Sequence, residues 1–327
     1  MTMQIELPEI GEFDVPVLII CFNRPRYIAE QLRCIRLVKP KKVYIACDGP
    51  RSRPGDLEKV SAVRTAFLDG IDWDCKLVTN FSEVNQGCGF GPINAMKWFF
   101  THEREGIVLE DDIMPSVDFF RYSSVMLDLF RDNPTVISVS GCNLGYDTNP
   151  SSVFLSKMMN MWGWATWADR FELIDFEMHA WNSVRCKRLY LLRRLAIGPL
   201  DFDFGWADFW RVIFERQAGP EKLDAWDYQF IFNQITSGKL TVFPGKNLIR
   251  NIGFDSDATH TDHQEHFMIG LEAGGINWPL QVDPEATNPD PVFYEEYIKQ
   301  KWSFYRRPNW KFYVGNLLRK LTFQSRR

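Results

Sequence analysis

Three consecutive carboxylates, Glu110, Asp111 and Asp112, directly follow a short apolar segment that has the composition of a buried strand. Anionic side chains this close together repel one another and are costly to bury without a positive partner. A hard divalent cation such as Mg²⁺ or Mn²⁺ supplies that charge, and it prefers a few carboxylate oxygens plus substrate phosphates to a complete protein cage. The triplet therefore predicts a divalent-cation site, with an exposed acidic turn as the alternative.

A glycine-rich segment, Asn85-Gln-Gly-Cys-Gly-Phe-Gly91, precedes an expected helix. Asn85 and Gly87 are candidates for contacting a phosphorylated ligand, because glycine lets the backbone come close and a helix N-terminus favours anions. No Gly-Lys-Ser/Thr follows, which excludes a P-loop. A tight turn is the alternative interpretation.

Apolar strands and amphipathic helices alternate around these residues. Strands are expected at 15–22, 42–47, 76–81, 106–109, 136–141 and 240–243, and helices at 25–36, 55–68, 87–99 and 115–130. This alternation predicts an α/β fold with an open, Rossmann-like, mostly parallel sheet and helices on both faces. Ligands of such sheets bind beyond the carboxyl ends of the strands, and Asn23, Arg24, Asp48 and the acidic triplet all fall there. We expect Asn23 to cap the first helix, with Pro25 just inside its start.

Composition narrows the class of protein. The chain has 327 residues, 45% of them hydrophobic, which excludes disorder, and 38 basic against 42 acidic residues, which argues against a nucleic-acid partner. No apolar run approaches the ~20 residues that span a bilayer, and the acidic start lacks the apolar region of a secretory signal. Seven scattered cysteines suggest reduced thiols. We therefore expect a cytoplasmic protein.

Four motifs occur in order along the chain. They are Pro16-Val-Leu-Ile-Ile-Cys-Phe-Asn-Arg-Pro25, Val108-Leu-Glu-Asp-Asp-Ile-Met-Pro-Ser-Val-Asp-Phe-Phe120, Ala225-Trp226-Asp227 and Asn251-Ile-Gly-Phe-Asp-Ser-Asp-Ala-Thr-His260. Together they resemble the inverting glycosyltransferases of GT-A fold, and most closely the N-acetylglucosaminyltransferase I family. The resemblance implies a metal-dependent enzyme that moves a sugar from a nucleoside-diphosphate sugar to a glycan or lipid-linked glycan. UDP-N-acetylglucosamine is the expected donor, and Mn²⁺ or Mg²⁺ the expected cofactor.

The resemblance also implies roles for single residues. Asp112 would bind the metal, and Asp227 would be the general base that deprotonates the acceptor hydroxyl. The family pairs two aspartates at the base, whereas Tyr228 follows Asp227 here, so Asp203 and Asp208 stay competitors. A helix N-terminal carboxylate is the structural alternative for Asp227.

The resemblance implies a second set of residues that would contact the nucleotide. By the same resemblance, Arg24 and Asp48 would contact the base or its surroundings, and Glu110 and Asp111 would hold base and ribose groups. His260 is expected at the metal or the diphosphate, while His263 and His266 fit a solvated surface, with a zinc site as an alternative.

An aromatic-rich turn is expected at Met161-Trp-Gly-Trp-Ala-Thr-Trp167. Indole faces match the apolar faces of sugar rings, so Trp162 and Trp164 are candidates for lining a sugar pocket, and packing in the core is the alternative.

The expected organisation has three parts: a nucleotide-sugar-binding half at 1–145, an acceptor and catalytic half at 146–282, and a linker with a basic aromatic tail at 283–327. The segment 297–327 holds nine Lys or Arg and no acid. This composition suits peripheral contact with the inner face of an anionic membrane, and packing on the acidic body of the protein fits equally well. A nucleotidyltransferase and a non-catalytic carbohydrate-binding protein are the alternative functions.

Overall fold

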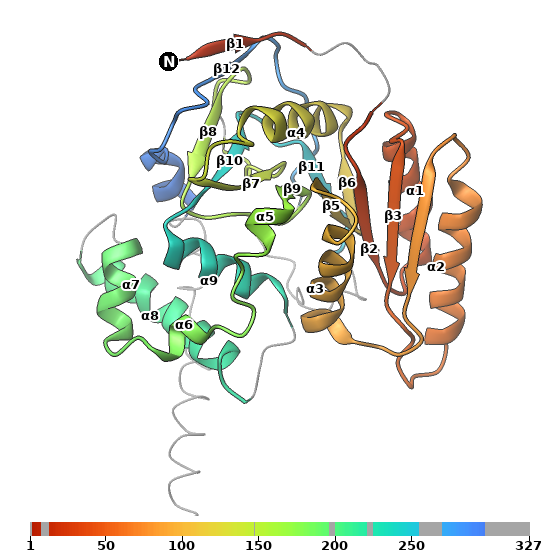
Figure 1. Cartoon of the computed structure of the whole chain (residues 1–327), viewed down its shortest axis with the longest axis horizontal. Helices are drawn as coiled ribbons and strands as arrows, with labels where there is room; N and C mark the ends of the chain where they lie inside the picture. The colour runs from red at the N-terminus through yellow and green to blue at the C-terminus, as the bar shows by residue number, and fades with distance from the viewer. Residues whose placement is uncertain are drawn as a thin grey trace, which may run out of the picture.

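The computed structural model describes residues 2–7, 13–146, 148–195, 200–220, 225–254 and 270–297, without the side chains of 200–204. Its centre is an eight-stranded sheet (Figure 1). In spatial order the strands are β4 (Lys76–Phe81), β3 (Lys42–Cys47), β2 (Val17–Cys21), β5 (Glu105–Glu110), β9 (Trp164–Trp167), β7 (Val136–Ser140), β10 (Leu240–Pro244) and β8 (Val153–Ser156).

Most strands of this sheet run in one direction. Strands β4, β3, β2 and β5 are parallel neighbours, and β10 pairs in parallel with β7. Strand β9 is antiparallel to both β5 and β7, and β8 is antiparallel to β10. The predicted α/β class with a mostly parallel sheet is confirmed, and the sheet takes strands from both 1–145 and 146–282.

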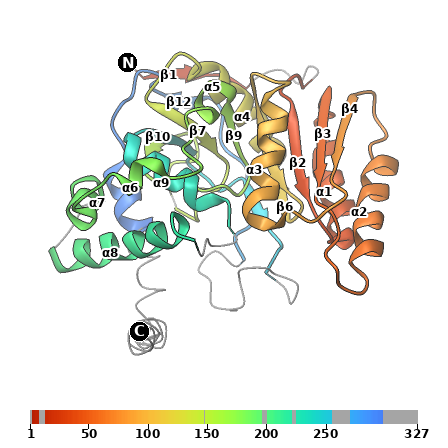
Figure 2. The same ribbon diagram turned by 60° about the horizontal axis from the view of Figure 1, so that its bottom comes forward.

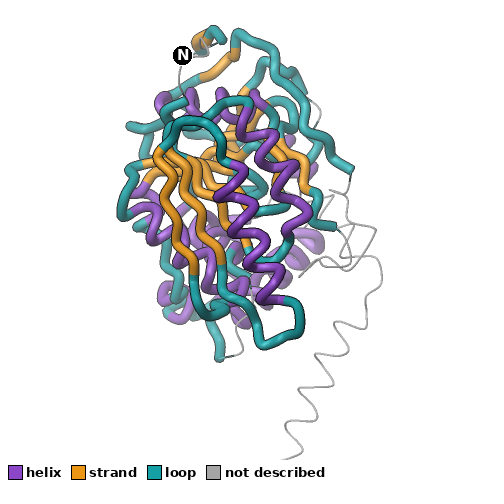
Figure 3. Tube along the Cα trace, turned by 90° about the vertical axis from the view of Figure 1, so that its right-hand side faces the viewer, coloured by secondary structure: helices purple, strands orange, loops and turns teal. Residues whose placement is uncertain are grey.

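Helices flank the sheet (Figures 2 and 3). They are α1 (Pro25–Arg36), α2 (Asp56–Gly70), α3 (Gly87–Phe100), α4 (Val117–Leu129), α5 (Ala168–Phe171), α6 (His179–Asn182), α7 (Lys187–Leu195), α8 (Leu200–Gln217) and α9 (Asp227–Ser237). Helices α1 and α2 lie side by side on one face of β2–β4, because consecutive right-handed crossovers in one direction stay on one face. The reversal from β4 back to β5 places α3 on the other face.

Two small antiparallel sheets complete the structure. Strand β1 (Met3–Ile5) pairs with β12 (Leu280–Val282), and β6 (Ile113–Pro115) pairs with β11 (Ile249–Asn251). The second pairing brings β11 beside the acidic triplet, which directly precedes β6. No helix among the described residues is long and apolar enough to cross a bilayer.

The central strands are apolar without interruption because both of their faces are covered. Residues 17–19 of β2 and 107–109 of β5 are at most 1% exposed. Burial of each such side chain stabilises the fold by roughly 1.5–3 kcal/mol. This continuous pattern, typical of parallel strands, is what made the strands recognisable in the sequence.

The structure corrects two local expectations. Pro25 begins α1 as expected, but the residue at the cap position is Arg24, which makes no capping side-chain hydrogen bond. Asn23 instead donates a hydrogen bond to Asp56 at 2.8 Å. The segment 161–167 is not a turn throughout, because Trp164–Trp167 form strand β9 in the middle of the sheet.

The chain order creates a switch point between β2 and β5. The chain runs outward from β2 to β3 and β4, then returns to the other side of β2 as β5. In the register of β2 and β5, Ile20 lies opposite Glu110. A crevice opens at such a point, because the connections leave the two strand ends in opposite directions.

Candidate active site

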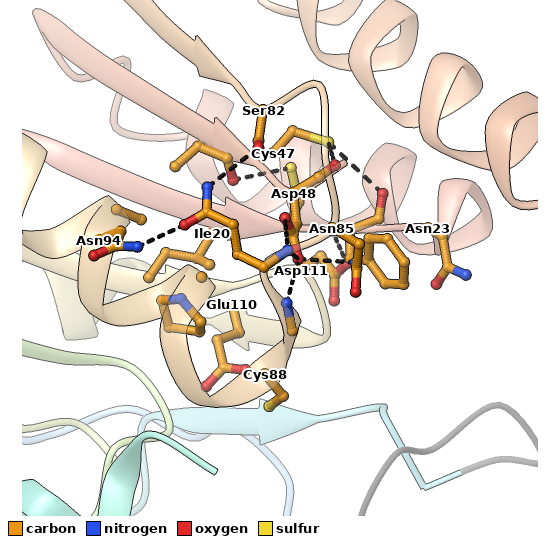
Figure 4. Close-up of a pocket in the computed structure, with 18 of the residues that line it drawn as sticks. Ile20, Asn23, Cys47, Asp48, Ser82, Asn85, Cys88, Asn94, Glu110 and Asp111 are labelled. Atoms are coloured by element: carbon orange, nitrogen blue, oxygen red, sulfur yellow. Dashed lines mark hydrogen bonds between the residues drawn. The ribbon is translucent and has the colours of Figure 1, made fainter. Parts of the chain in front are cut away.

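A cavity of about 630 Å³ lies beyond the carboxyl ends of β2, β3, β4 and β5 (Figure 4). Its size falls within the usual range for small-molecule sites. The residues that line it include most of the expected nucleotide contacts, namely Asn23, Arg24, Asp48, Asn85, Gly87, Glu110 and Asp111. The structure therefore brings together at one cavity residues that four separate segments contribute.

Asp111 and Asp112 form the tight connection between β5, which ends at Glu110, and β6. Gln31 on α1, which is fully buried, holds this connection from behind. Its Nε2 donates to the Glu110 carbonyl at 2.6 Å and to the Ile113 carbonyl at 3.1 Å. Gln31 was not predicted, and its one signal was a polar residue on the apolar face of an amphipathic helix.

Arg24 lies against two of the three carboxylates. Its guanidinium is 3.1 Å from Asp111 Oδ1 and 2.8 Å from Asp112 Oδ2. The Phe22 N–H also donates to Asp111 Oδ2 at 3.1 Å. The side chains of Arg24, Asp111 and Asp112 are only 16%, 6% and 13% exposed, so the turn after β2 and the acidic connection are joined by shielded ion pairs.

One guanidinium does not neutralise the cluster. Burial, followed by the charges of Asp112, Asp111 and Asp227, raises the pKa of Glu110 to about 8. Burial and the charge of Asp111 raise the pKa of Asp112 to about 6. Burial also raises the pKa of Asp111, although Arg24 opposes it. Around neutral pH the cluster therefore favours the arrival of additional positive charge.

These residues fit a divalent cation that is shared with a ligand. The donors are carboxylate oxygens, which hard cations prefer. The described residues contain no group of three side chains placed to hold a metal alone. Such an ion would complete its coordination with oxygens of a bound phosphate, as Mg²⁺ does in nucleotide sites.

The backbone of β11 and the residues after it packs closely on Asp112. The Ile252 N–H donates to the Asp112 carbonyl at 2.9 Å. A Cβ at position 253 would lie 2.1 Å from Asp112 Oδ2, so only glycine fits there. Gly253 is a second residue that was not predicted, and it lies in the fourth of the sequence motifs.

Asp227 begins helix α9 and belongs to the same region as the acidic triplet. Its charge contributes to raising the pKa of Glu110. The competitor Asp208 lies on α8, 3.0 Å from Arg211 Nε, and also pairs with Arg188. Burial raises the pKa of Asp208, but the two arginines outweigh it and hold that pKa below its ordinary value. Asp208 thus has a structural role, and the side chain of Asp203 lies outside the described residues.

Asp48 organises the glycine-rich loop. Its carboxylate accepts from Gly49 N–H at 2.8 Å, Asn85 Nδ2 at 2.9 Å, Gln86 N–H at 2.9 Å and Gly87 N–H at 3.1 Å. Gly87 has φ +79°, a conformation that favours glycine. Asp48 lines the cavity, and its hydrogen bonds position the start of α3 there.

Three basic residues also line the cavity: Arg51, Arg53 and Lys59. They were not singled out from the sequence, although the segment Arg51-Ser-Arg-Pro, separated from Asp48 by two residues, was the available signal. Arg51 Nε lies 2.6 Å from Asp56 Oδ2, and this pairing, together with Asn23, lowers the pKa of Asp56 to about 2 despite its burial. The loop after β3 is thereby tied to the turn after β2.

The remaining candidates lie elsewhere. Trp164 is 1% exposed in the core, where its ring stacks on Trp226 at 6.2 Å, and it does not line the cavity. Trp162 is half-buried and packs edge-on against Phe254 at 5.4 Å, also outside this cavity. His260, expected at the metal or diphosphate, lies outside the described residues. No protein-family model matches the chain, so the interpretation of the site depends on its own chemistry.

Proposed function

We propose that the protein is a metal-dependent, inverting glycosyltransferase of GT-A type. It transfers a sugar, GlcNAc by first expectation, from a UDP-linked donor to a glycan or lipid-linked glycan. The observation that carries the proposal is the meeting of Arg24 with the acidic triplet, of which Glu110 and Asp111 line a cavity at the switch point of the sheet, with the charge of Asp227 acting on Glu110. The same proposal places the enzyme in the cytoplasm, with peripheral contact to the membrane through the basic tail.

The donor nucleotide occupies the cavity between the loops that follow β2, β3 and β4. Asn23, Asn85 and Gly87 line the space proposed for base and ribose. The guanidinium groups of Arg51 and Arg53 add positive charge on the same wall. This pattern of a few polar groups in a concave site suits a nucleoside diphosphate better than an apolar ligand.

Asp112 would hold the cation, with Glu110 and Asp111 adding negative charge beside it. A bound divalent ion supplies Lewis-acid stabilisation of the diphosphate leaving group. Arg24 holds the two aspartates in place and contributes a fixed positive charge next to them. His260 is the proposed further contact of the metal or the diphosphate.

Asp227 would take the proton from the acceptor hydroxyl as that oxygen attacks the anomeric carbon. The acceptor then approaches from the side opposite the diphosphate, and a single displacement inverts the configuration. The position of Asp227 at the start of α9 and its charge, which acts on Glu110, support this role.

Thermal unfolding with a panel of nucleotides, each with and without Mn²⁺, tests donor binding. Ligands that bind the folded state raise its melting temperature by mass action. We expect stabilisation by UDP that requires Mn²⁺. No stabilisation by any nucleotide would overturn the proposal.

Two matched variants then test catalysis with donors screened by product mass. Asp227→Asn should abolish sugar transfer and keep UDP–Mn²⁺ stabilisation, whereas Asp208→Asn should keep transfer wherever the protein folds. If Asp208→Asn lost sugar transfer and Asp227→Asn kept it, Asp208 on α8 would be the general base instead of Asp227. Retained glycan binding with no turnover in the unmodified protein would favour a non-catalytic carbohydrate-binding function.

A further inference from the structure

Strands β2 and β3 both end in a cysteine at the same level. Cys21 and Cys47 are register partners in this parallel pair. Neighbouring strands lie about 4.8 Å apart, and register partners project their side chains to the same face. Both residues line the cavity and are 4% and 2% exposed, and Cys47 is labelled in Figure 4.

Each thiol contacts backbone carbonyls, Cys21 Sγ that of Ala46 at 3.5 Å and Cys47 Sγ those of Asp48 and Phe22, and each sulfur also affects the pKa of the other. The Cys21 thiol, together with Arg64 on α2, lowers the pKa of Cys47 against the effect of burial. Burial, and the interaction with Cys47, raise the pKa of Cys21. One sulfur is thus the better thiolate and its neighbour keeps its proton, which is the polarity that thiol oxidation and disulfide closure require.

We propose that Cys21 and Cys47 form a peroxide-sensitive dithiol in the wall of the cavity. The Cys47 sulfur attacks a peroxide oxygen, becomes a sulfenic acid and releases one water. The Cys21 sulfur then attacks the oxidised sulfur, forms the S–S bond and releases a second water, so that two thiols supply the two electrons that reduce one peroxide. The strand spacing of about 4.8 Å lies within the range of Cα separations that disulfides span.

Closure of this disulfide alters the two loops that shape the cavity. Cys47 Sγ lies 3.5 Å from the Asp48 carbonyl and 3.7 Å from the Phe22 carbonyl, and both thiol contacts end when the sulfur is bonded to Cys21. Phe22 leads into the Asn23–Arg24 turn, and Asp48 holds the glycine-rich loop. This part rests on the proposed function: oxidation should weaken UDP binding roughly fivefold, the equivalent of about one hydrogen bond.

Peptide mapping after treatment of the whole protein with hydrogen peroxide tests the dithiol directly. After tryptic digestion without reduction, the peptide that holds Cys21 should be joined to the peptide that holds Cys47, and dithiothreitol should separate them. Sulfenic or sulfinic products without this joined pair would overturn the proposal, as would a disulfide from either residue to Cys88.

Matched variants separate this pair from the other thiols. Cys21→Ser and Cys47→Ser should each abolish the joined peptide, whereas Cys186→Ser, which removes an exposed thiol, should leave it intact. UDP affinity of the oxidised and reduced protein is the second measurement. A joined peptide with unchanged UDP affinity would refute the effect of the disulfide on the cavity. Absence of UDP binding in the reduced protein would refute the proposed function, and the proposal of the dithiol would still stand.

Discussion

Replacement of Arg24 by methionine removes the only positive charge that contacts the two buried aspartates in the described structure. Arg24→Met keeps the length and much of the packing of the side chain. At an effective dielectric constant of ~20, the attraction in each of the two contacts of Arg24 with the aspartates is about 4 kcal/mol. The free energy needed to remove the arginine from water offsets part of this attraction. Removing one partner of a buried ion pair costs about 3–5 kcal/mol, so we expect a loss of about 3 kcal/mol in the free energy of unfolding at pH 8.

The loss should depend on pH with a defined sign. The pKa values of Asp112 and Glu110, about 6 and about 8, already exceed those of carboxyls in an unfolded chain, and removal of Arg24 raises them further. A group whose folded pKa is raised favours the fold below its unfolded pKa and loses that contribution as the pH rises. The difference between Arg24→Met and the unmodified protein should therefore be small at pH 5 and grow towards pH 8.

Urea unfolding at pH 5, 6, 7 and 8 measures this difference. Arg36→Met is the matched control, because Arg36 and Asp72 form a pair whose side chains are 38% and 60% exposed, and its loss should cost less than about 1 kcal/mol at every pH. A loss below about 1 kcal/mol for Arg24→Met at pH 8, or one of the same size at pH 5 and pH 8, would refute the assignment of Arg24 as the internal counter-charge of the acidic connection.

Three other outcomes follow from the same structure. Through Glu110 alone the unliganded protein should lose about 3–4 kcal/mol of stability between pH 5 and pH 8, and Glu110→Gln should flatten this slope in urea unfolding. An unchanged slope would contradict the raised pKa of Glu110. Asp48→Ala should remove the acceptor of the Gln86 and Gly87 N–H groups, lower the free energy of unfolding by about 2 kcal/mol and weaken UDP binding in titration calorimetry, whereas Asp48→Asn should lose less. Asp56→Asn should cost about 1–2 kcal/mol at pH 7 and much less near pH 2, because a lowered pKa gives stability above the unfolded pKa that is lost as the pH falls through the folded pKa. Equal loss at both pH values would exclude the ion pair as the cause.

Much of the nucleotide side of the molecule was predictable from local sequence. Strands β3 and β4 were predicted at the residues where they occur, and β2, β5 and the helices between them within about two residues. Apolar runs bounded by glycine, proline and asparagine are local signals, and parallel pairing sends the strand ends to one edge. The placement of Asn23, Arg24, Asp48 and the acidic triplet near one another followed from this rule before any coordinates.

The resemblance to GT-A glycosyltransferases supplied roles that local physics does not. It pointed to Asp227, which no periodicity distinguishes from Asp208. The structure separates the two, because Asp208 is held by two arginines while Asp227 acts electrostatically on Glu110. That the roles themselves are catalytic stays a prediction for the transfer assay.

By itself, the sequence determined which segments become strands and helices and which polar residues follow the strands, because backbone propensity and hydrophobic period act over a few residues. The tertiary structure alone decided that β9 inserts antiparallel between β5 and β7, which makes Trp164, a candidate for a sugar pocket, a core residue. It also decided that Arg24 lies between two aspartates and that Gly253 makes room for one of them. These contacts join segments far apart in the chain, and their geometry depends on how every intervening element packs, which no local pattern contains.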